Sequence, residues 1–177
     1  MESAAAQEAS RFTPIWPDLA SRCFRIVGRE NEMRRGLSPD ALGDLFELPL
    51  AAVLSIAKPD GTVFSRPVWH RWQSGRFEVQ FPAGDRKIAM LERDARLTML
   101  LAEHAFPYRA IEVRGHAWMT EDRYHERAIE ICRRYVEAYD PATPVESYVS
   151  TEPGRIVEVE AEVVHCWDYA DDAMMPT

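Results

Sequence analysis

The stretch QFPAGDRKIAMLERDARLTMLLAEHAFPYRAIEVRG, residues 80–115, decides the fold. Its pattern predicts a strand, a tight turn, a short helix over 85–94, a second strand, a turn and a third strand. Arg86 and Lys87 fall in the first turn of that helix, where unpaired N–H groups and the helix dipole disfavour cations unless an anion compensates them. Two explanations fit this pair. Asp85 caps the helix beside solvated cations, or the cations and the N–H groups bind a phosphate.

Composition sets the broad class of the protein. The chain has 177 residues, of which 46% are hydrophobic, and a formal net charge of −8. This length supports one globular domain that needs no disulfide or metal to fold, and the acidic balance argues against a nucleic-acid partner. The start has no apolar stretch of signal-peptide length, and no apolar run reaches the roughly 20 residues that span a bilayer. The three cysteines have no CxxC spacing. We therefore expect a cytoplasmic protein without a membrane partner or a zinc site.

Short turns between apolar runs predict an antiparallel arrangement of strands. The Pro59-Asp60-Gly61 and Gln73-Ser74-Gly75 turns are too short for helical crossovers. Pro67 indicates a sheet edge or a bulge, and Gly115 a bulge or a close backbone approach. The expected strands cover residues 51–57, 62–72, 76–81, 96–102 and 110–120, with a last strand from residue 154.

Two further helices are expected around the strands. One begins with Ser38 as its N-cap and Pro39 at its first position, and it ends before Pro49. The longest covers residues 121–139, where apolar residues recur at a spacing of three to four.

These elements predict a mostly β protein with six antiparallel strands in a closed or split β-barrel and with peripheral helices. Residues 1–36 are expected to form a partly disordered N-terminal extension, residues 37–170 the barrel domain, and residues 171–177 a tail.

Five features in a fixed order resemble a known superfamily. They are a strand pair around PDG, the segment SRPVWHRW, the turn GDRK, a helix with DAR before LTMLL, and the segment PYRAIEVRG. On these features, residues 48–169 resemble the FMN-binding split barrels of the pyridoxamine 5′-phosphate oxidase superfamily, and most closely its flavin/deazaflavin oxidoreductase branch. The resemblance implies a split barrel that forms a homodimer, with the cofactor bound between the two subunits.

The resemblance also implies which positions bind the cofactor. Arg86 and Lys87 match the phosphate-binding pair, which favours the phosphate explanation given above. Arg66 and Arg71 match positions that hold the polar edge and chain of the cofactor. Ala110 falls where the family oxidase has a ring contact, so that contact is either absent or replaced by Arg109. The implied cofactor-binding residues are Arg66, Pro67, Val68, Trp69, Arg71, Gln80, Phe81, Arg86, Lys87 and Arg109.

The implied activity is hydride transfer to or from a small organic substrate, with FMN or the deazaflavin coenzyme F420 as cofactor. The cofactor carries the hydride, so no catalytic acid or base is required of the protein. The alternative is a non-catalytic dimer that binds or stores flavin or haem, for which a histidine such as His70, His116 or His165 would have to face an apolar slot. Asp85 adds a carboxylate that the family's phosphate turn lacks, so it should weaken anion binding.

Overall fold

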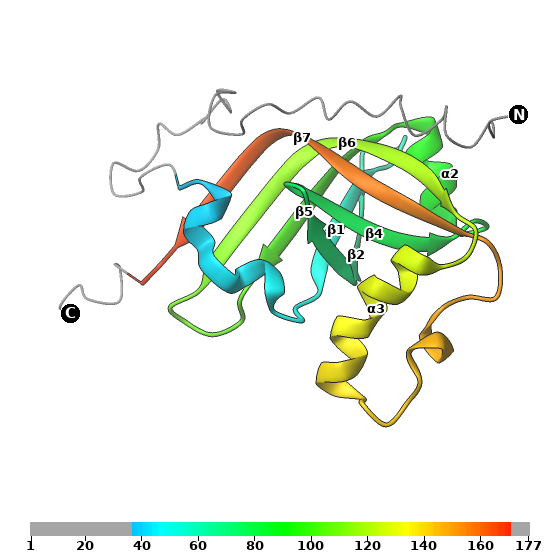
Figure 1. Ribbon diagram of the computed structural model, residues 1–177. Coiled ribbons are helices and arrows are strands. Elements are labelled where there is room, and N and C mark those ends of the chain that lie inside the picture. Colours follow the sequence, from blue (N-terminus) through cyan, green and yellow to red (C-terminus); the bar gives the residue numbers. More distant parts are fainter. Residues whose placement is uncertain (1–36, 171–177) are drawn as a thin grey trace, which may run out of the picture.

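The computed structural model describes residues 37–170, which form a strongly curved, seven-stranded antiparallel sheet with helices around it (Figure 1). The strand order is β2-β1-β5-β6-β7-β4-β3. The strands are β1 (Ala52–Ala57), β2 (Val63–Val68), β3 (His70–Gln73), β4 (Arg76–Pro82), β5 (Arg96–Ala102), β6 (Arg109–Asp122) and β7 (Gly154–Asp168). The helices are η2 (Pro39–Glu47), α2 (Arg86–Arg93), α3 (Glu126–Tyr139) and η3 (Val145–Tyr148). The expected extension and tail lie outside the described residues.

The sheet has one strand more than the six predicted, because the expected strand over 62–72 is divided at Trp69. Its two halves, β2 and β3, lie at opposite edges of the sheet. Past the break, the backbone N–H of His70 donates to the hydroxyl of Tyr135 on α3 at 3.0 Å. The sheet is therefore split rather than closed. Pro67 lies in the edge strand β2, where a missing N–H group is tolerated, as predicted.

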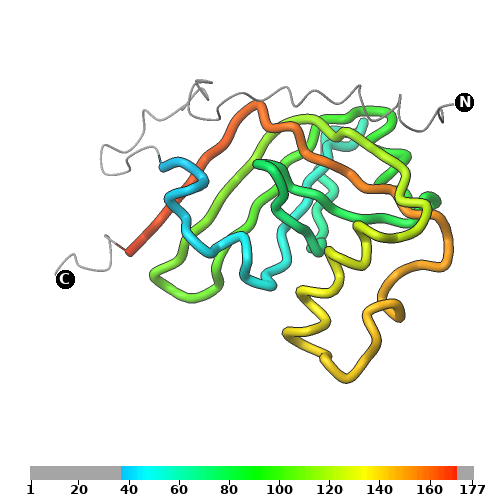
Figure 2. Tube along the Cα trace, viewed as in Figure 1, coloured from blue at the N-terminus to red at the C-terminus, as the bar shows by residue number. Residues whose placement is uncertain are grey.

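A bulge at Gly115 lets the two longest strands pair over their whole length. The β6–β7 ladder runs from Arg109 opposite Asp168 to Asp122 opposite Gly154, with one register shift between Arg114 and Gly115 (Figure 2). A Cβ atom on Gly115 would overlap the carbonyl oxygen of Glu160. Both readings of this glycine, a bulge and a close backbone approach, are confirmed.

The first helix differs from the sequence prediction. The segment η2 is a 3₁₀ helix with a non-helical residue inside it, Gly43 at φ 58°, and Ser38 makes no side-chain cap hydrogen bond. Its Phe46 ring stacks on Trp72 of β3 at a centroid distance of 4.3 Å. The segment thus packs against β3, β6 and β7.

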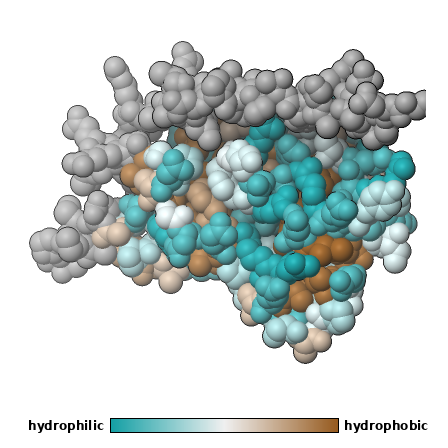
Figure 3. Space-filling model, in the orientation of Figure 1, coloured by the Kyte–Doolittle hydropathy of each residue, from teal (hydrophilic) through white to brown (hydrophobic). Residues whose placement is uncertain are grey.

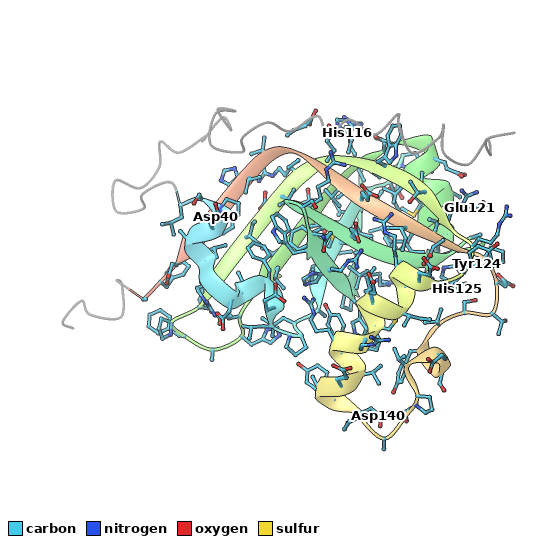
Figure 4. All side chains as sticks on the ribbon, in the orientation of Figure 1. Asp40, His116, Glu121, Tyr124, His125 and Asp140 are labelled. Carbon is cyan, nitrogen blue, oxygen red and sulfur yellow. The ribbon has the colours of Figure 1, made fainter. Side chains whose placement is uncertain are left out.

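The long helix also begins later than predicted, because residues 121 and 122 extend β6. The buried Asp122 carboxylate accepts the backbone N–H of Ala128 at 2.9 Å and so caps α3 from the strand end. His125, at φ 59°, forms the turn between the two elements (Figure 4).

The apolar core fills the concave side of the sheet. Alternate residues of the central strands are fully or almost fully buried, as period-two patterning requires. They include Leu54, Ile56, Phe77, Val79, Met99, Leu101, Ile111, Val113, Val157 and Val159. Among the helices of residues 37–170, none is both long and apolar enough to span a membrane.

Candidate functional site

Two arginines from different elements lie over one aromatic ring. The guanidinium carbon of Arg86, in the first turn of α2, is 4.5 Å from the ring centroid of Phe64, and that of Arg66 is 4.7 Å from the same centroid. Phe64 and Arg66 are two residues apart in β2, so they share a face of this edge strand. Arg66 also donates to the carbonyl oxygen of Ser65 at 2.9 Å.

Neither of these arginines forms an ion pair with any carboxylate in the part of the chain that the structure describes. A cation over an aromatic face gains only about 0.5–1 kcal/mol at an exposed site, and the two like charges repel each other. The edge of β2 is thus locally positive in a chain whose net charge is −8. A phosphate or carboxylate group would complement it, because guanidinium groups bind such anions through paired N–H donors.

Lys87, the second member of the expected phosphate pair, points elsewhere. Its Nζ atom lies 2.6 Å from Oδ2 of Asp85 and 4.5 Å from the ring centroid of Phe81. The other carboxylate oxygen, Oδ1 of Asp85, accepts the backbone N–H of Lys87 at 2.8 Å and caps α2. Asp85 is therefore the predicted cap, and it also neutralises Lys87. The structure brings Arg86 together with Arg66 rather than with Lys87.

The residues expected beside the cofactor ring are divided between the two faces of the sheet. Val68 and Phe81 are buried on the concave side, whereas Pro67 is exposed. Trp69, at the break between the edge strands, stacks on Tyr135 with a centroid distance of 4.8 Å and an interplanar angle of 3°. The Nε2 atom of Gln80 is buried without a hydrogen-bond partner and lies next to Gly154, on the side of β4 that faces α3.

Arg71 belongs to an ion-pair network that joins α3 to the sheet. It donates through Nε to the buried Glu78 at 2.9 Å and pairs with Glu130 of α3. Arg127 of α3 also pairs with Glu78 and reaches Glu158 of β7 at 2.8 Å. Hydrophilic side chains gather over β4 and β7 above α3 in Figure 3. The Arg71 guanidinium is thus paired with carboxylates, and it lies on β3, away from Arg86.

A cavity of about 250 Å³ lies on this same side of the molecule. In it, Arg134 binds neutral groups: Nη2 donates to the carbonyl oxygen of His70 at 2.7 Å and to the hydroxyl of Tyr135 at 2.9 Å. Burial and the Arg134 charge lower the pKa of His70 to about 3. The cavity is lined by Glu47, His70, Arg71, Trp72, Gln73, Glu130, Ile131 and Arg134, and it shares no residue with the Arg66–Arg86 pair.

Arg109 holds η2 against the turn between β5 and β6. Its guanidinium donates to both carboxylate oxygens of Glu103, to Asp44 at 2.6 Å and to the carbonyl oxygen of Leu42 at 2.9 Å. These hydrogen bonds raise the pKa of Arg109 and lower the pKa of Glu103. The Arg109 guanidinium is thus anchored within the fold by two carboxylates and a carbonyl oxygen, and its expected contact with a cofactor ring stays a prediction.

The three strand histidines show no shared pocket for a metal. His70 is buried in the core, His116 on the upper rim of β6 pairs with Glu162 at 3.2 Å, and His165 stacks on Trp167 (Figure 4). Within residues 37–170, no group of three or more histidine, cysteine or acidic side chains is placed to hold a metal ion.

Sequence reasoning missed Phe64, although it lies two residues before Arg66 in an expected strand and therefore on the same face. It identified Asp85 as a cap but not as the ion partner of Lys87. The signal was present, because a cap carboxylate lies within reach of side chains in the first helical turn.

Comparison with known proteins supports the fold and leaves the activity open. No protein-family model matches the sequence, and a search of curated proteins finds no match. A solved structure of a conserved hypothetical protein from Mycobacterium tuberculosis is similar, with a TM-score of 0.63 and 18% identity over 83% of this chain and 96% of that one.

Two further solved structures carry names that describe a chemistry. One is an F420 reductase, with a TM-score of 0.57 and 22% identity over 72% of this chain and 98% of that one. The other is a putative pyridoxamine 5′-phosphate oxidase from Listeria innocua, with a TM-score of 0.53 and 15% identity over 72% of this chain and 95% of that one. The resemblance drawn from the sequence is confirmed at the level of the fold, which is that of the pyridoxamine 5′-phosphate oxidase-like split barrels.

Proposed function

We propose that this protein is a flavin- or deazaflavin-dependent oxidoreductase that transfers hydride between its cofactor and a small organic substrate. The observation that carries the proposal is the pair of arginines over Phe64, which has no carboxylate partner among residues 37–170. Solved structures named as an F420 reductase and as a pyridoxamine 5′-phosphate oxidase share the fold, and we extend that class of chemistry to this chain as part of the proposal.

The chain's own residues divide the work of binding. Arg66 and Arg86 would hold the phosphate of the cofactor, each through charge-assisted hydrogen bonds. The backbone around Pro67 and Val68 would flank the ring, because an edge strand has N–H and C=O groups that no neighbouring strand uses. Phe81 would border the ribityl-type chain. Arg71 and Arg109 are paired with carboxylates, Trp69 stacks on Tyr135, and Gln80 lies on the side of β4 that faces α3, so we leave these four residues out.

Hydride chemistry is supplied by the isoalloxazine-type ring of the cofactor when it is bound. The protein binds the phosphate, fixes the ring edge and limits the access of water to the reacting face. Proton exchange with a described side chain is not needed for this role, and we assign no catalytic acid or base.

We further propose a homodimer with the cofactor between the subunits. The support is the convex face of the sheet, where Pro67, Val53 and Leu100 lie opposite one another on three neighbouring strands. Val53 and Leu100 are each 37% exposed, so this apolar row is open to a partner. A second copy would bury it beside the edge strand that carries Arg66.

Ligand titration tests the proposal directly. The purified protein should quench the fluorescence of FMN or F420 saturably, and haem should give no bound Soret spectrum at the same protein concentration. Reduction of the bound ligand and reoxidation by added substrate would then distinguish an enzyme from a storage protein. A haem-loaded protein with no affinity for FMN or F420 would contradict the proposal.

Charge reversal tests the assigned residues. The double variant Arg66→Glu, Arg86→Glu should weaken the binding of FMN or F420 at least about a hundredfold, because two charge-assisted contacts become repulsive. The matched control, Arg93→Glu with Arg123→Glu, makes the same change in net charge at exposed positions outside the pair. Equal affinities in the two double variants would refute the phosphate assignment.

A further inference from the structure

We propose that the cavity between η2, β3 and α3 binds a small zwitterion with an apolar side chain, of the class of the neutral α-amino acids. The cavity measures about 250 Å³ and shares no residue with the Arg66–Arg86 pair. The proposal therefore concerns a second site, and it does not rest on the proposed oxidoreductase function.

The α3 side of the cavity carries a cation without a counterion. This cation is Arg134, whose side chain is half-buried. Its guanidinium donates to the carbonyl oxygens of Phe46 and His70 and to the hydroxyl of Tyr135, which are all neutral acceptors. Among residues 37–170, no carboxylate forms an ion pair with it. Because removing a guanidinium from water is costly unless an anion compensates it, the cavity is the place where such an anion would bind.

Two nitrogen atoms of the same wall also lack a hydrogen-bond partner. They are Nε of Arg134 and Nε2 of His70, and both atoms are buried. Both residues line the cavity, and the His70 side chain is fully buried. Unpaired buried polar atoms are costly and rare in native proteins, so these two indicate a missing partner. A ligand carboxylate would supply both the negative charge and the hydrogen-bond acceptor.

The opposite charge comes from Glu47, the last residue of η2. Its side chain is exposed and lines the cavity, and within the described part of the chain it pairs with no cation, Arg134 included. The other two charged groups of the cavity, Arg71 and Glu130, already pair with each other. The cavity thus presents one cation and one anion that do not neutralise each other.

This charge pattern selects the class of ligand. A simple carboxylate would be attracted by Arg134 and repelled by Glu47, and a simple amine would meet the reverse. A molecule that carries both an ammonium and a carboxylate group satisfies both side chains. Trp72 and Ile131 add apolar surface to the wall, so an apolar side chain on the ligand would be removed from water there.

Isothermal titration calorimetry on the full-length protein tests the site with leucine and two matched probes. The probe 4-methylpentanoate lacks the ammonium group of leucine, and 3-methylbutylamine lacks its carboxylate. Wild type should bind leucine saturably at one molecule per chain. Each single-charge probe should bind at least about tenfold more weakly, because one charge-assisted hydrogen bond is lost. Valine and phenylalanine extend the titration to a smaller and a larger side chain.

A substitution at Glu47 assigns the ammonium end of the ligand. Arg134 also holds parts of η2 and β3 through its hydrogen bonds, so its replacement would confuse binding with folding. Glu47→Gln should weaken leucine binding about tenfold and should bind 4-methylpentanoate no more weakly than wild type does, since a repulsive charge is removed. The control is Glu137→Gln, at an exposed position of α3 outside the cavity, and its affinities should stay within about twofold of wild type.

Three results would each overturn the inference. The first is no saturable binding of leucine, valine or phenylalanine by wild type, which would leave the cavity to water. The second is equal affinity of wild type for leucine and 4-methylpentanoate. The third is a Glu47→Gln variant that binds leucine as tightly as wild type. None of these results bears on the binding of FMN or F420, so the proposed function is tested separately.

Discussion

Replacing Gly115 by alanine should remove a large part of the stability of the fold. Gly115 is at the bulge in β6, directly opposite Ala161 of β7. An added Cβ atom would overlap the carbonyl oxygen of Glu160, and it would lie 2.8 Å from the carbonyl carbon of Glu160 and 3.1 Å from the Cα atom of Ala161. These are backbone atoms of a paired strand, so no side-chain rotation relieves the contact.

The magnitude follows from how far β7 must move. Carbon atoms pack at roughly 3.5–4.0 Å, so the two strands have to separate by about 1 Å at this point. That separation weakens one or two ladder hydrogen bonds in a buried region, at about 1–3 kcal/mol each. Overpacking adds about 1–3 kcal/mol, and the lower entropy of the unfolded alanine chain returns less than 1 kcal/mol. The expected loss is about 3 kcal/mol, against a typical total of roughly 5–15 kcal/mol.

Urea unfolding followed by tryptophan fluorescence measures this loss as a lower midpoint at unchanged slope. Gly84→Ala is the matched control, because the nearest atom to its added Cβ is a flexible carboxylate oxygen of Glu152 at 4.0 Å. That control should lie within about 0.5 kcal/mol of wild type. A Gly115→Ala variant as stable as Gly84→Ala would refute the backbone contact and with it the bulge register.

Two further predictions concern the junction of α3 with the sheet. Tyr135→Phe should cost about 1–3 kcal/mol in urea unfolding, because the buried hydroxyl accepts from the N–H of His70 and donates to the carbonyl oxygen of Leu50 at 2.9 Å. Tyr139→Phe, at an exposed hydroxyl, should cost less than about 0.5 kcal/mol, and equal losses would contradict the assignment. Burial and Arg134 lower the pKa of His70 to about 3, below its ordinary 6.5, so the unfolded chain takes up the proton first. Stability should therefore fall with pH from about 6.5 towards 3, by up to about 1.4 kcal/mol per pH unit, and His70→Leu should lack this component. If the stability of wild type and of His70→Leu changes with pH in the same way between pH 6.5 and 3, protonation of His70 does not contribute.

Elements set by neighbouring residues were predictable from the sequence. The helix after Asp85, the strand over 96–102 and the bulge at Gly115 each depend on a cap, an alternating pattern or a single glycine within the segment itself. The strand over 96–102 has the bounds that its apolar alternation predicts. These are local preferences, and the tertiary structure does not override them.

Elements set by distant partners were not predictable in the same way. The break at Trp69 depends on Tyr135, which is far along the chain and takes up the N–H of the residue after the break. At Trp69 the local pattern favours a continuous strand, and a side chain from α3 decides otherwise. The break inside η2, by contrast, falls at a glycine of the segment itself, Gly43 at φ 58°.

Hairpin register explains which of the arginines expected at the cofactor pair with carboxylates of the fold. The turn at Ser74 and Gly75, both at positive φ, is the two-residue type that places Arg71 opposite Glu78. The sequence predicts both strands and the turn between them, so it also predicts the ion pair between Arg71 and Glu78. Arg109 lies next to Glu103 across the hairpin between β5 and β6. There the backbone N–H of Glu103 donates to the carbonyl oxygen of Arg109 at 3.0 Å, which brings the two side chains together.

The same register leaves the other two arginines available. Arg66 lies opposite Leu54 in the β1–β2 hairpin, so its cross-strand neighbour offers no carboxylate. Arg86 is followed one helical turn later by Met90, and its guanidinium turns to Phe64 instead. A positive charge that faces an aliphatic or aromatic neighbour has no carboxylate partner within the fold. One that faces an acidic side chain forms an ion pair that stabilises the fold. Sorting the strand arginines by their cross-strand partner would thus have separated Arg66, opposite Leu54, from Arg71, opposite Glu78.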